Sequence, residues 1–136
     1  MDAFDADVLI YAGVDGHPLG RRVRALFEVT AGTAAGIGSV LLLPEVLTKP
    51  MRDGVTDEVG ALVGLLSRLE LRPVDPATAE VATSLAASHR LRAADAVHLA
   101  TAVLAGADRF ITNNRRDFRA TISEIDITFP DALRDP

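Results

Sequence analysis

The chain has 136 residues, of which 49% are hydrophobic and 24% are charged, a balance typical of one globular domain rather than a disordered segment. It contains no cysteine, which excludes disulfide scaffolds, thiolate metal sites and cysteine nucleophiles. The formal net charge is −5, so the molecule as a whole lacks the basic character of most nucleic-acid binders. Aromatic residues make up only 4% of the chain, which leaves few side chains that could stack on bases.

The amino-terminal residues, MDAFDADVLIYA, begin acidic and lack the basic segment that opens a signal peptide. The longest uncharged stretch, residues 29–44, contains three glycines and is shorter than the ~20 residues that a membrane-spanning helix needs. We therefore expect a cytoplasmic protein with no membrane segment.

No repeat, linker or low-complexity segment is visible, so residues 1–136 are expected to form a single domain. The expected elements are, in chain order, a strand at 3–6, helices at 8–12 and 17–30, a strand at 36–39, helices at 40–48 and 57–70, a strand at 71–74, helices at 76–89 and 93–105, and strands at 109–111 and 126–129. Pro50 is expected to end the helix that begins at residue 40. This alternation predicts an α/β fold with a mainly parallel sheet and helices on both faces.

Acidic and amide side chains follow the predicted strands or open the next helices. They are Asp5 and Asp7 after the first strand, Glu45 one turn into the helix after the second, Asp95 near the start of the most apolar helix, and Asn113, Asn114 and Asp117 after the fourth strand. Because the active crevice of a parallel sheet lies at the carboxyl ends of its strands, these side chains are expected to converge on one rim.

Such a group of carboxylates indicates a metal site. Two ionised carboxylates ~4 Å apart repel each other by about 4 kcal/mol at an effective dielectric constant of ~20, so a larger group requires bound cations or raised pKa values. Oxygen ligands without cysteine favour Mg²⁺ or Mn²⁺ over zinc. The chemistry of such a site is hydrolysis of phosphate esters or phosphodiesters.

Asp95 and His98 also have structural interpretations. Asp95 could be stabilised by the positive end of its own helix, cap the backbone, or pair with an arginine such as Arg92. His98 lies one helical turn beyond Asp95, where it is either a hydrogen-bonded core histidine or a support for that carboxylate.

Three segments together are typical of one protein family. The first is FDADVLIYA at residues 4–12, the second is Ser39-Val40 followed by Glu45-Val46-Leu47, and the third is LRAADAVHLATAVLAGADRFITNNRRDF at residues 91–118. With these segments in this order, the chain resembles PIN-domain ribonucleases, and most closely the VapC-type toxins of bacterial and archaeal toxin–antitoxin pairs.

The resemblance implies a PIN-like three-layer α/β/α sandwich with a mainly parallel central sheet. It also implies a Mg²⁺- or Mn²⁺-dependent RNA endonuclease that hydrolyses phosphodiester bonds as the toxin of a type II toxin–antitoxin system. The catalytic and metal-binding roles of the family fall on Asp5, Glu45 and Asp95. A small cognate antitoxin and a homodimer are the partners that the family implies.

The chain departs from the family at one position. Members often carry a fourth acid where this chain has Asn114, so a second metal ion would be held more weakly here. Asp117 and Asp7 are further candidate metal ligands, and capping of a turn or helix is the alternative role of each.

RNA binding would have to come from local basic residues, given the negative net charge. Arg115, Arg116 and Arg119 follow the Asn114 segment and are the first candidates for contacts with RNA. Four more arginines are weaker candidates, at positions 21, 22, 24 and 52. The alternative is that each of them is a solvated surface residue.

Three other functions are alternatives to this one. Asp5-Ala6-Asp7-Val8-Leu9 also fits the opening of a HAD-type phosphohydrolase, but that family and the receiver domains of two-component signalling need a late lysine, and the only lysine is Lys49. A catalytically silent PIN fold that acts as a binding module is the third alternative. Asn114 favours this silent module, and the intact acids named above argue against it.

Overall fold

The computed structural model describes residues 1–28 and 33–136 of the chain. The strands are β1 (Asp2–Phe4), β2 (Gly36–Ser39), β3 (Leu69–Arg72), β4 (Arg109–Ile111) and β5 (Asp126–Thr128). The helices are α1 (Ala6–Ala12), α2 (Pro18–Glu28), α3 (Leu42–Arg52), α4 (Thr56–Leu66), α5 (Pro76–His89) and α6 (Ala93–Leu104), followed by a short 3₁₀ helix, η1 (Pro130–Ala132). All strand pairs of the sheet are parallel, in the order β3-β2-β1-β4-β5.

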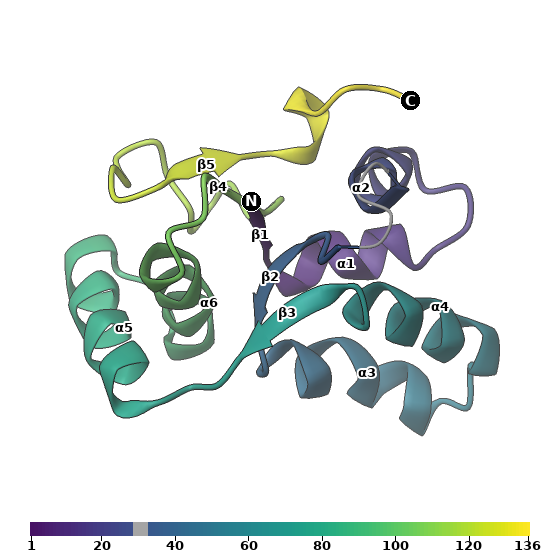
Figure 1. Cartoon of the computed structure of the whole chain (residues 1–136), viewed down its shortest axis with the longest axis horizontal. Coiled ribbons are helices and arrows are strands. Elements are labelled where there is room, and N and C mark those ends of the chain that lie inside the picture. Colours follow the sequence, from purple (N-terminus) through teal and green to yellow (C-terminus); the bar gives the residue numbers. More distant parts are fainter. Residues whose placement is uncertain (29–32) are drawn as a thin grey trace.

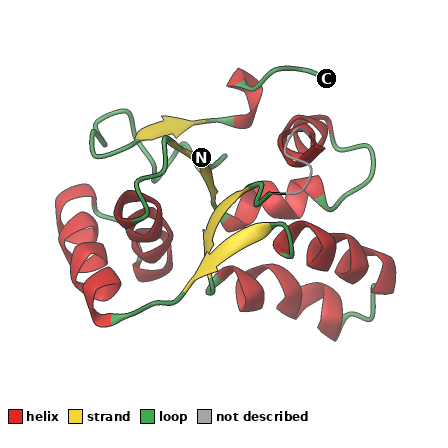
Figure 2. Ribbon diagram, in the orientation of Figure 1, coloured by secondary structure: helices red, strands yellow, loops and turns green. Residues whose placement is uncertain are grey.

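Helices cover both faces of the sheet (Figures 1 and 2): α5 and α6 lie on one face, and α1 to α4 lie on the other. Successive strand residues point to opposite faces, so β1 places Phe4 in the core beneath α1 to α4 and Ala3 in the core beneath α5 and α6. In β4, Ile111 and Phe110 divide in the same way. The α/β/α sandwich expected from the sequence is therefore confirmed.

The order of the strands places a topological switch point between β1 and β4. From β1 the chain moves to β2 and β3 on one side, and it then returns to β4 and β5 on the other. Phe4 of β1 is paired with Ile111 of β4 at the carboxyl ends of these strands. The residues that follow this pair, Asp5 and Thr112, therefore meet where parallel sheets bind their ligands.

The first helix begins earlier than the sequence predicted. The strand expected at residues 3–6 ends at Phe4, and Asp5 takes an extended backbone as the N-cap of α1, where its carboxylate accepts a hydrogen bond from the Ala6 amide. The helix expected at residue 8 therefore starts at Ala6, because this cap satisfies one of the free amides of the first turn.

The predicted end of the third helix at Pro50 was wrong. α3 runs from Leu42 to Arg52 with Pro50 inside its last turn. The proline ring is buried, and the Pro50 carbonyl accepts a hydrogen bond from the Val55 amide. Packing of this ring offsets the helix hydrogen bond that a proline cannot donate.

The boundary between α4 and β3 was also predicted wrongly. The helix expected at residues 57–70 ends at Leu66, and the strand expected at 71–74 begins at Leu69. All four residues of β3 pair with β2, from Gly36–Leu69 to Ser39–Arg72. Sheet pairing therefore decides the state of Leu69 and Glu70, although the spacing of the apolar residues continues a helical pattern.

Other boundaries agree with the prediction to within two residues in the described part of the chain. The helix expected at 17–30 is α2, which begins at Pro18 and is described to Glu28, while Val29 and Thr30 lie outside the described residues. Among the helices of residues 1–28 and 33–136, none is both long and apolar enough to cross a membrane.

Candidate active site

Asp5 is the most buried of the candidate acids and is 4% exposed. Its Oδ1 accepts from the Ala6 amide at 2.8 Å, and its Oδ2 accepts from the hydroxyl of Thr112 at 2.8 Å. Burial raises the pKa of Asp5, and the negative charge of Glu45 adds to the rise, while His98 and the two hydrogen bonds oppose it. Asp5 is therefore a rigidly held carboxylate in a place that disfavours its charge.

A series of hydrogen bonds joins the loop after β4 to Asp5. The buried hydroxyl of Thr112, which donates to Asp5, also accepts from the Asn114 amide at 3.2 Å. The side chain of Asn114 donates to Asp117 Oδ2 at 2.9 Å, and the Asp117 amide donates back to Asn114 Oδ1 at 3.3 Å. Asn114 and Asp117, both named from the sequence, thus lie in direct contact, and the Phe118 amide bonds to the Asn114 carbonyl rather than to Asp117.

Asp7 lies in the first turn of α1 and links this helix to the same loop. Its Oδ2 accepts from the Asn113 amide at 3.0 Å, whereas its buried Oδ1 has no hydrogen-bond partner in the described part of the chain. Burial raises the pKa of Asp7 to about 7, with a further contribution from the charge of Asp5. Asp7 does not cap α1, because Asp5 does so.

Asp95 enters from the other side of the sheet, in the first turn of α6. Burial, together with the charges of Asp5 and Asp117, raises the pKa of Asp95 to about 6. The N-cap of α6 is Arg92, and the ion pairs found between described residues include none between Asp95 and an arginine. Neither the backbone cap nor the pair with Arg92 is thus seen in the described residues, whereas the place of Asp95 in the first turn puts it at the positive end of α6.

Glu45, in the first turn of α3, contacts a buried histidine. His98 Nε2 lies 3.1 Å from Glu45 Oε1; the His98 side chain is 1% exposed and that of Glu45 is 33% exposed. Burial by itself would lower the pKa of His98, but the hydrogen bond to Glu45 and the charges of Asp5, Glu45 and Asp95 outweigh it and raise the pKa. His98 is therefore a hydrogen-bonded core histidine, and the carboxylate that it contacts is Glu45 rather than Asp95.

The donors fit a hard cation in their chemistry. Buried carboxylates with raised pKa values and the unpartnered Oδ1 of Asp7 are oxygen ligands with uncompensated charge, which a divalent ion would neutralise. In residues 1–28 and 33–136, however, no group of three or more His, Asp or Glu side chains is arranged so that it could hold a metal ion. A bound cation would therefore have to draw the carboxylates together or be held partly through water.

Comparison with known proteins decides the family. The family model of the PIN domain matches residues 3–122. The chain belongs to the PIN domain family. This confirms the family expected from the three sequence segments, and a search of curated proteins finds no match to the chain.

Two solved structures share this PIN fold. A toxin–antitoxin complex from Klebsiella pneumoniae is 24% identical, has a TM-score of 0.72, and is matched over 96% of this chain and 98% of that one. The crystal structure of VapBC2 from Rickettsia felis, bound to a DNA fragment from their promoter, is 17% identical, has a TM-score of 0.70, and is matched over 94% and 97%. At these identities the likeness shows the fold.

The three arginines that are the first candidates for contacts with RNA differ in how many contacts they make within the chain. Arg115 contacts Asp131 and lies over the ring of Phe129 at 4.2 Å. Arg116 and Arg119 are exposed, and the only side-chain bond found for them in the described residues runs from Arg119 Nε to the Arg116 carbonyl.

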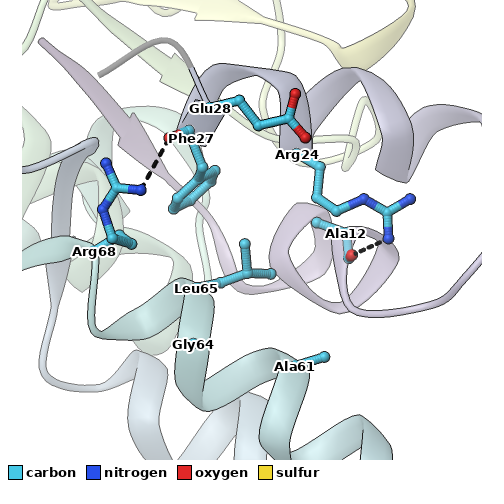
Figure 3. Close-up of a pocket in the computed structure, with 8 residues that line it drawn as sticks. All are labelled: Ala12, Arg24, Phe27, Glu28, Ala61, Gly64, Leu65 and Arg68. Carbon is cyan, nitrogen blue, oxygen red and sulfur yellow. Dashed lines mark hydrogen bonds between the residues drawn. The ribbon is translucent and has the colours of Figure 1, made fainter. Parts of the chain in front are cut away.

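Most of the weaker arginine candidates already form ion pairs or hydrogen bonds within the chain. Arg21 and Arg22 pair with Asp135 near the carboxyl terminus, and Arg24 bonds to the Ala12 carbonyl at 3.1 Å. Arg24 also lines a pocket of about 450 Å³ between α1, α2 and α4 (Figure 3). The residues that line it do not include Asp5, Glu45 or Asp95. Arg52 lies 3.8 Å from Asp53.

Thr112 is the residue of this site that sequence reasoning missed. It is 0% exposed and bonds to Asp5 and Asn114 at once. The available signal was its place directly after a strand that pairs with β1, since parallel register brings the residues after paired strand ends together.

Proposed function

We propose that this PIN domain is a metal-dependent RNA endonuclease that hydrolyses phosphodiester bonds and serves as the toxin of a type II toxin–antitoxin system. Family membership supports the fold and the chemistry. The single observation that carries the proposal is that Asp5, Glu45 and Asp95, which come from three different helices or caps, lie close enough for the charge of Glu45 to raise the pKa of both aspartates and for the charge of Asp5 to raise that of Asp95.

Asp5, Glu45 and Asp95 are the proposed metal ligands and catalytic acids, and Asp7, Asn114 and Asp117 are secondary candidates. A bound Mg²⁺ or Mn²⁺ would neutralise phosphate oxygens and lower the pKa of a water. A second ion would be held more weakly, because Asn114 brings no charge and its side chain is already bonded to Asp117.

The chain's own residues position these acids. Thr112 and the Ala6 amide fix both oxygens of Asp5. His98 fixes Glu45 Oε1, which leaves Oε2 of this partly exposed carboxylate to accept a proton from an attacking water. Burial and the charges of Asp5 and Asp117 raise the pKa of Asp95 to about 6, so a cation that compensates those charges would favour the ionised form of Asp95.

Arg116 and Arg119 are the proposed contacts to RNA phosphates, because both are exposed and come shortly after Asn114 in the chain. Arg115 is the third, and RNA would have to compete with Asp131 for it. A small antitoxin and a second copy of the chain are the proposed partners. The support is that both structural neighbours named above are described as toxin–antitoxin or VapBC assemblies.

The test is RNA cleavage by the purified protein with EDTA, Mg²⁺ or Mn²⁺, beside Asp5→Asn and Asp95→Asn. The expected result is metal-dependent cleavage that both substitutions reduce by at least ~100-fold. Cleavage that needs no metal, or that survives both substitutions, would contradict the mechanism. A folded protein that cleaves no RNA yet binds a small partner tightly would instead favour the silent PIN module that Asn114 suggests.

A further inference from the structure

We infer that Tyr11, His17 and Asn113 form a binding site for one unpaired nucleobase beside the carboxylate site. The inference rests on the proposed RNA endonuclease function and specifies where a nucleotide next to the cleaved bond is held.

The two rings form a flat stacked pair. The centroids of Tyr11 and His17 are 4.5 Å apart, and the ring planes differ by 7°. Both residues are half-buried, so part of each remains accessible. Tyr11 is the only tyrosine of a chain that has no tryptophan, and bases stack on aromatic side chains of this kind in single-stranded RNA recognition.

The pair is connected to the loop that follows β4. Asn113 Nδ2 lies 3.5 Å from the Tyr11 hydroxyl, and the Asn113 amide donates to Asp7 at 3.0 Å. Tyr11 follows Asp7 by four residues on the same face of α1, about 6 Å along the helix axis. The rings therefore lie one step outward from the acids, where a neighbouring nucleotide would pass.

The rings are held in place before any ligand binds. A Cβ at Gly20 would lie 2.1 Å from the Tyr11 carbonyl oxygen, so glycine is what allows α2 to approach α1 this closely. The Gly20 amide donates to His17 Nδ1 at 3.2 Å, which leaves the proton of a neutral imidazole on Nε2. A rigid aromatic site loses little conformational entropy when a base binds.

Polar groups at the edge of the pair could read a base. These groups are hydrogen-bond donors and acceptors of the kind that bind base edges. They are the Tyr11 hydroxyl, the side-chain amide of Asn113 and His17 Nε2. Capping of α2 by His17 explains the bond from Gly20 and the ring stack. It does not explain why the polar end of Tyr11 meets the loop that carries Asn114.

Tyr11 reports on this site directly, because it is the only tyrosine and the chain has no tryptophan. We would titrate the non-cleaving Asp95→Asn protein with a short single-stranded RNA of mixed sequence and follow tyrosine emission and RNA anisotropy together. Emission should change along the same binding curve as anisotropy. A duplex of the same sequence should leave the emission unchanged, because its bases are not free to stack on a protein ring.

A double-mutant cycle identifies the base. A single abasic nucleotide is placed at each position of the RNA in turn. The loss of binding affinity that it causes is measured for the Asp95→Asn protein and for the same protein with Tyr11→Leu. Tyr11→Leu should weaken binding roughly tenfold, as expected for the loss of one stacked base. In the protein with Tyr11→Leu, the abasic nucleotide at one position of the RNA should cause no further loss of affinity.

Three variants separate binding from folding. Tyr11→Phe keeps the ring and should bind RNA nearly as tightly as the parent. His17→Asn keeps a capping side chain but removes the stacking ring, so it should weaken RNA binding about fivefold or more while Tm changes little. Val63→Ala, at an exposed position of α4, should change neither quantity.

Two outcomes would overturn the inference. If the wild type cleaves RNA and Asp95→Asn binds it, but tyrosine emission stays constant and the abasic costs do not depend on Tyr11, the base site is wrong and the proposed function stands. If no RNA is cleaved or bound, the proposed function and the base site fail together.

Discussion

His98 Nε2 lies 3.1 Å from Oε1 of Glu45, so a histidine buried in α6 holds the partly exposed carboxylate that α3 contributes to the site. The contact joins two helices on opposite faces of the sheet. It leaves one Glu45 oxygen free of His98 and helps to raise the pKa of His98. A positioned carboxylate of this kind is what the proposed activation of water requires.

Glu45→Gln should lower the pKa of His98, because it removes a charge and a charge-assisted hydrogen bond that both raise this pKa. RNA cleavage should fall by roughly 100-fold, as when a general base is lost. Proton NMR titration of the imidazoles measures the first effect, with His17 as the internal reference. An unchanged His98 titration would show that the Glu45 contact is not formed in solution.

Thr112→Val should destabilise the protein, because the hydroxyl donates to the buried carboxylate of Asp5 and also accepts from the Asn114 amide. The expected loss is roughly 1.5–3 kcal/mol in the free energy of unfolding, measured by urea denaturation. Thr112→Ser keeps the hydroxyl and should restore most of that loss. A valine variant as stable as the parent would contradict the role given to this hydroxyl.

The metal-free protein should become less stable as the pH rises. Folding raises the pKa of Asp7 to about 7 and that of Asp95 to about 6, each from the ordinary aspartate value of 3.8, so the folded state binds more protons than the unfolded state between these values. The stabilisation from these protons is complete below about pH 4 and disappears as the pH passes through about 7. The raised pKa of His98 acts in the same direction.

Differential scanning fluorimetry in EDTA should therefore give a lower Tm at about pH 8 than at about pH 5. Mn²⁺ should raise Tm more at the higher pH, because metal and protons compete for the same carboxylates. A Tm that is higher at pH 8, or a Mn²⁺ effect equal at both pH values, would contradict the assignment of these acids to a cation site.

Asp95→Asn should stabilise the metal-free protein near neutral pH while it abolishes cleavage. The substitution removes a charge that burial and the nearby Asp5 and Asp117 disfavour. The expected gain is ~1 kcal/mol, after allowance for the solvent that screens this half-exposed group. Thermal and urea unfolding measure it, and a loss of stability would mean that Asp95 is a structural helix cap.

Gly20→Ala should destabilise the protein by roughly 1–3 kcal/mol, because its Cβ would lie 2.1 Å from the Tyr11 carbonyl oxygen. Gly60→Ala in α4 is the matched control, since a Cβ there meets nothing within 4 Å. The control should gain about 0.4–1 kcal/mol in a helix. Equal effects of the two substitutions on urea unfolding would show that α1 and α2 do not pack as closely as described.

Local patterns predicted most of the fold. The capping residue Asp75 and the proline after it mark the start of α5, where the carboxylate accepts from the Thr78 amide. Sequence failed where a distant partner overrides local preference. Pro50 continues a helix because its ring is buried, and Leu69 joins a strand because Gly36 lies beside it.

The sequence by itself determined which chemical groups this protein has and roughly where each lies on an element. The lack of cysteine and the acids placed after strands or at the start of helices already favoured a hard-cation site, and the resemblance of three segments to PIN domains implied the fold. Only the tertiary structure decided which groups touch. Thr112 bonds to Asp5, His98 to Glu45 and Asn114 to Asp117, and burial then raises the pKa of Asp7 to about 7. These contacts join residues from separate elements, and the cost of a buried charge depends on the surrounding atoms, which local sequence does not specify.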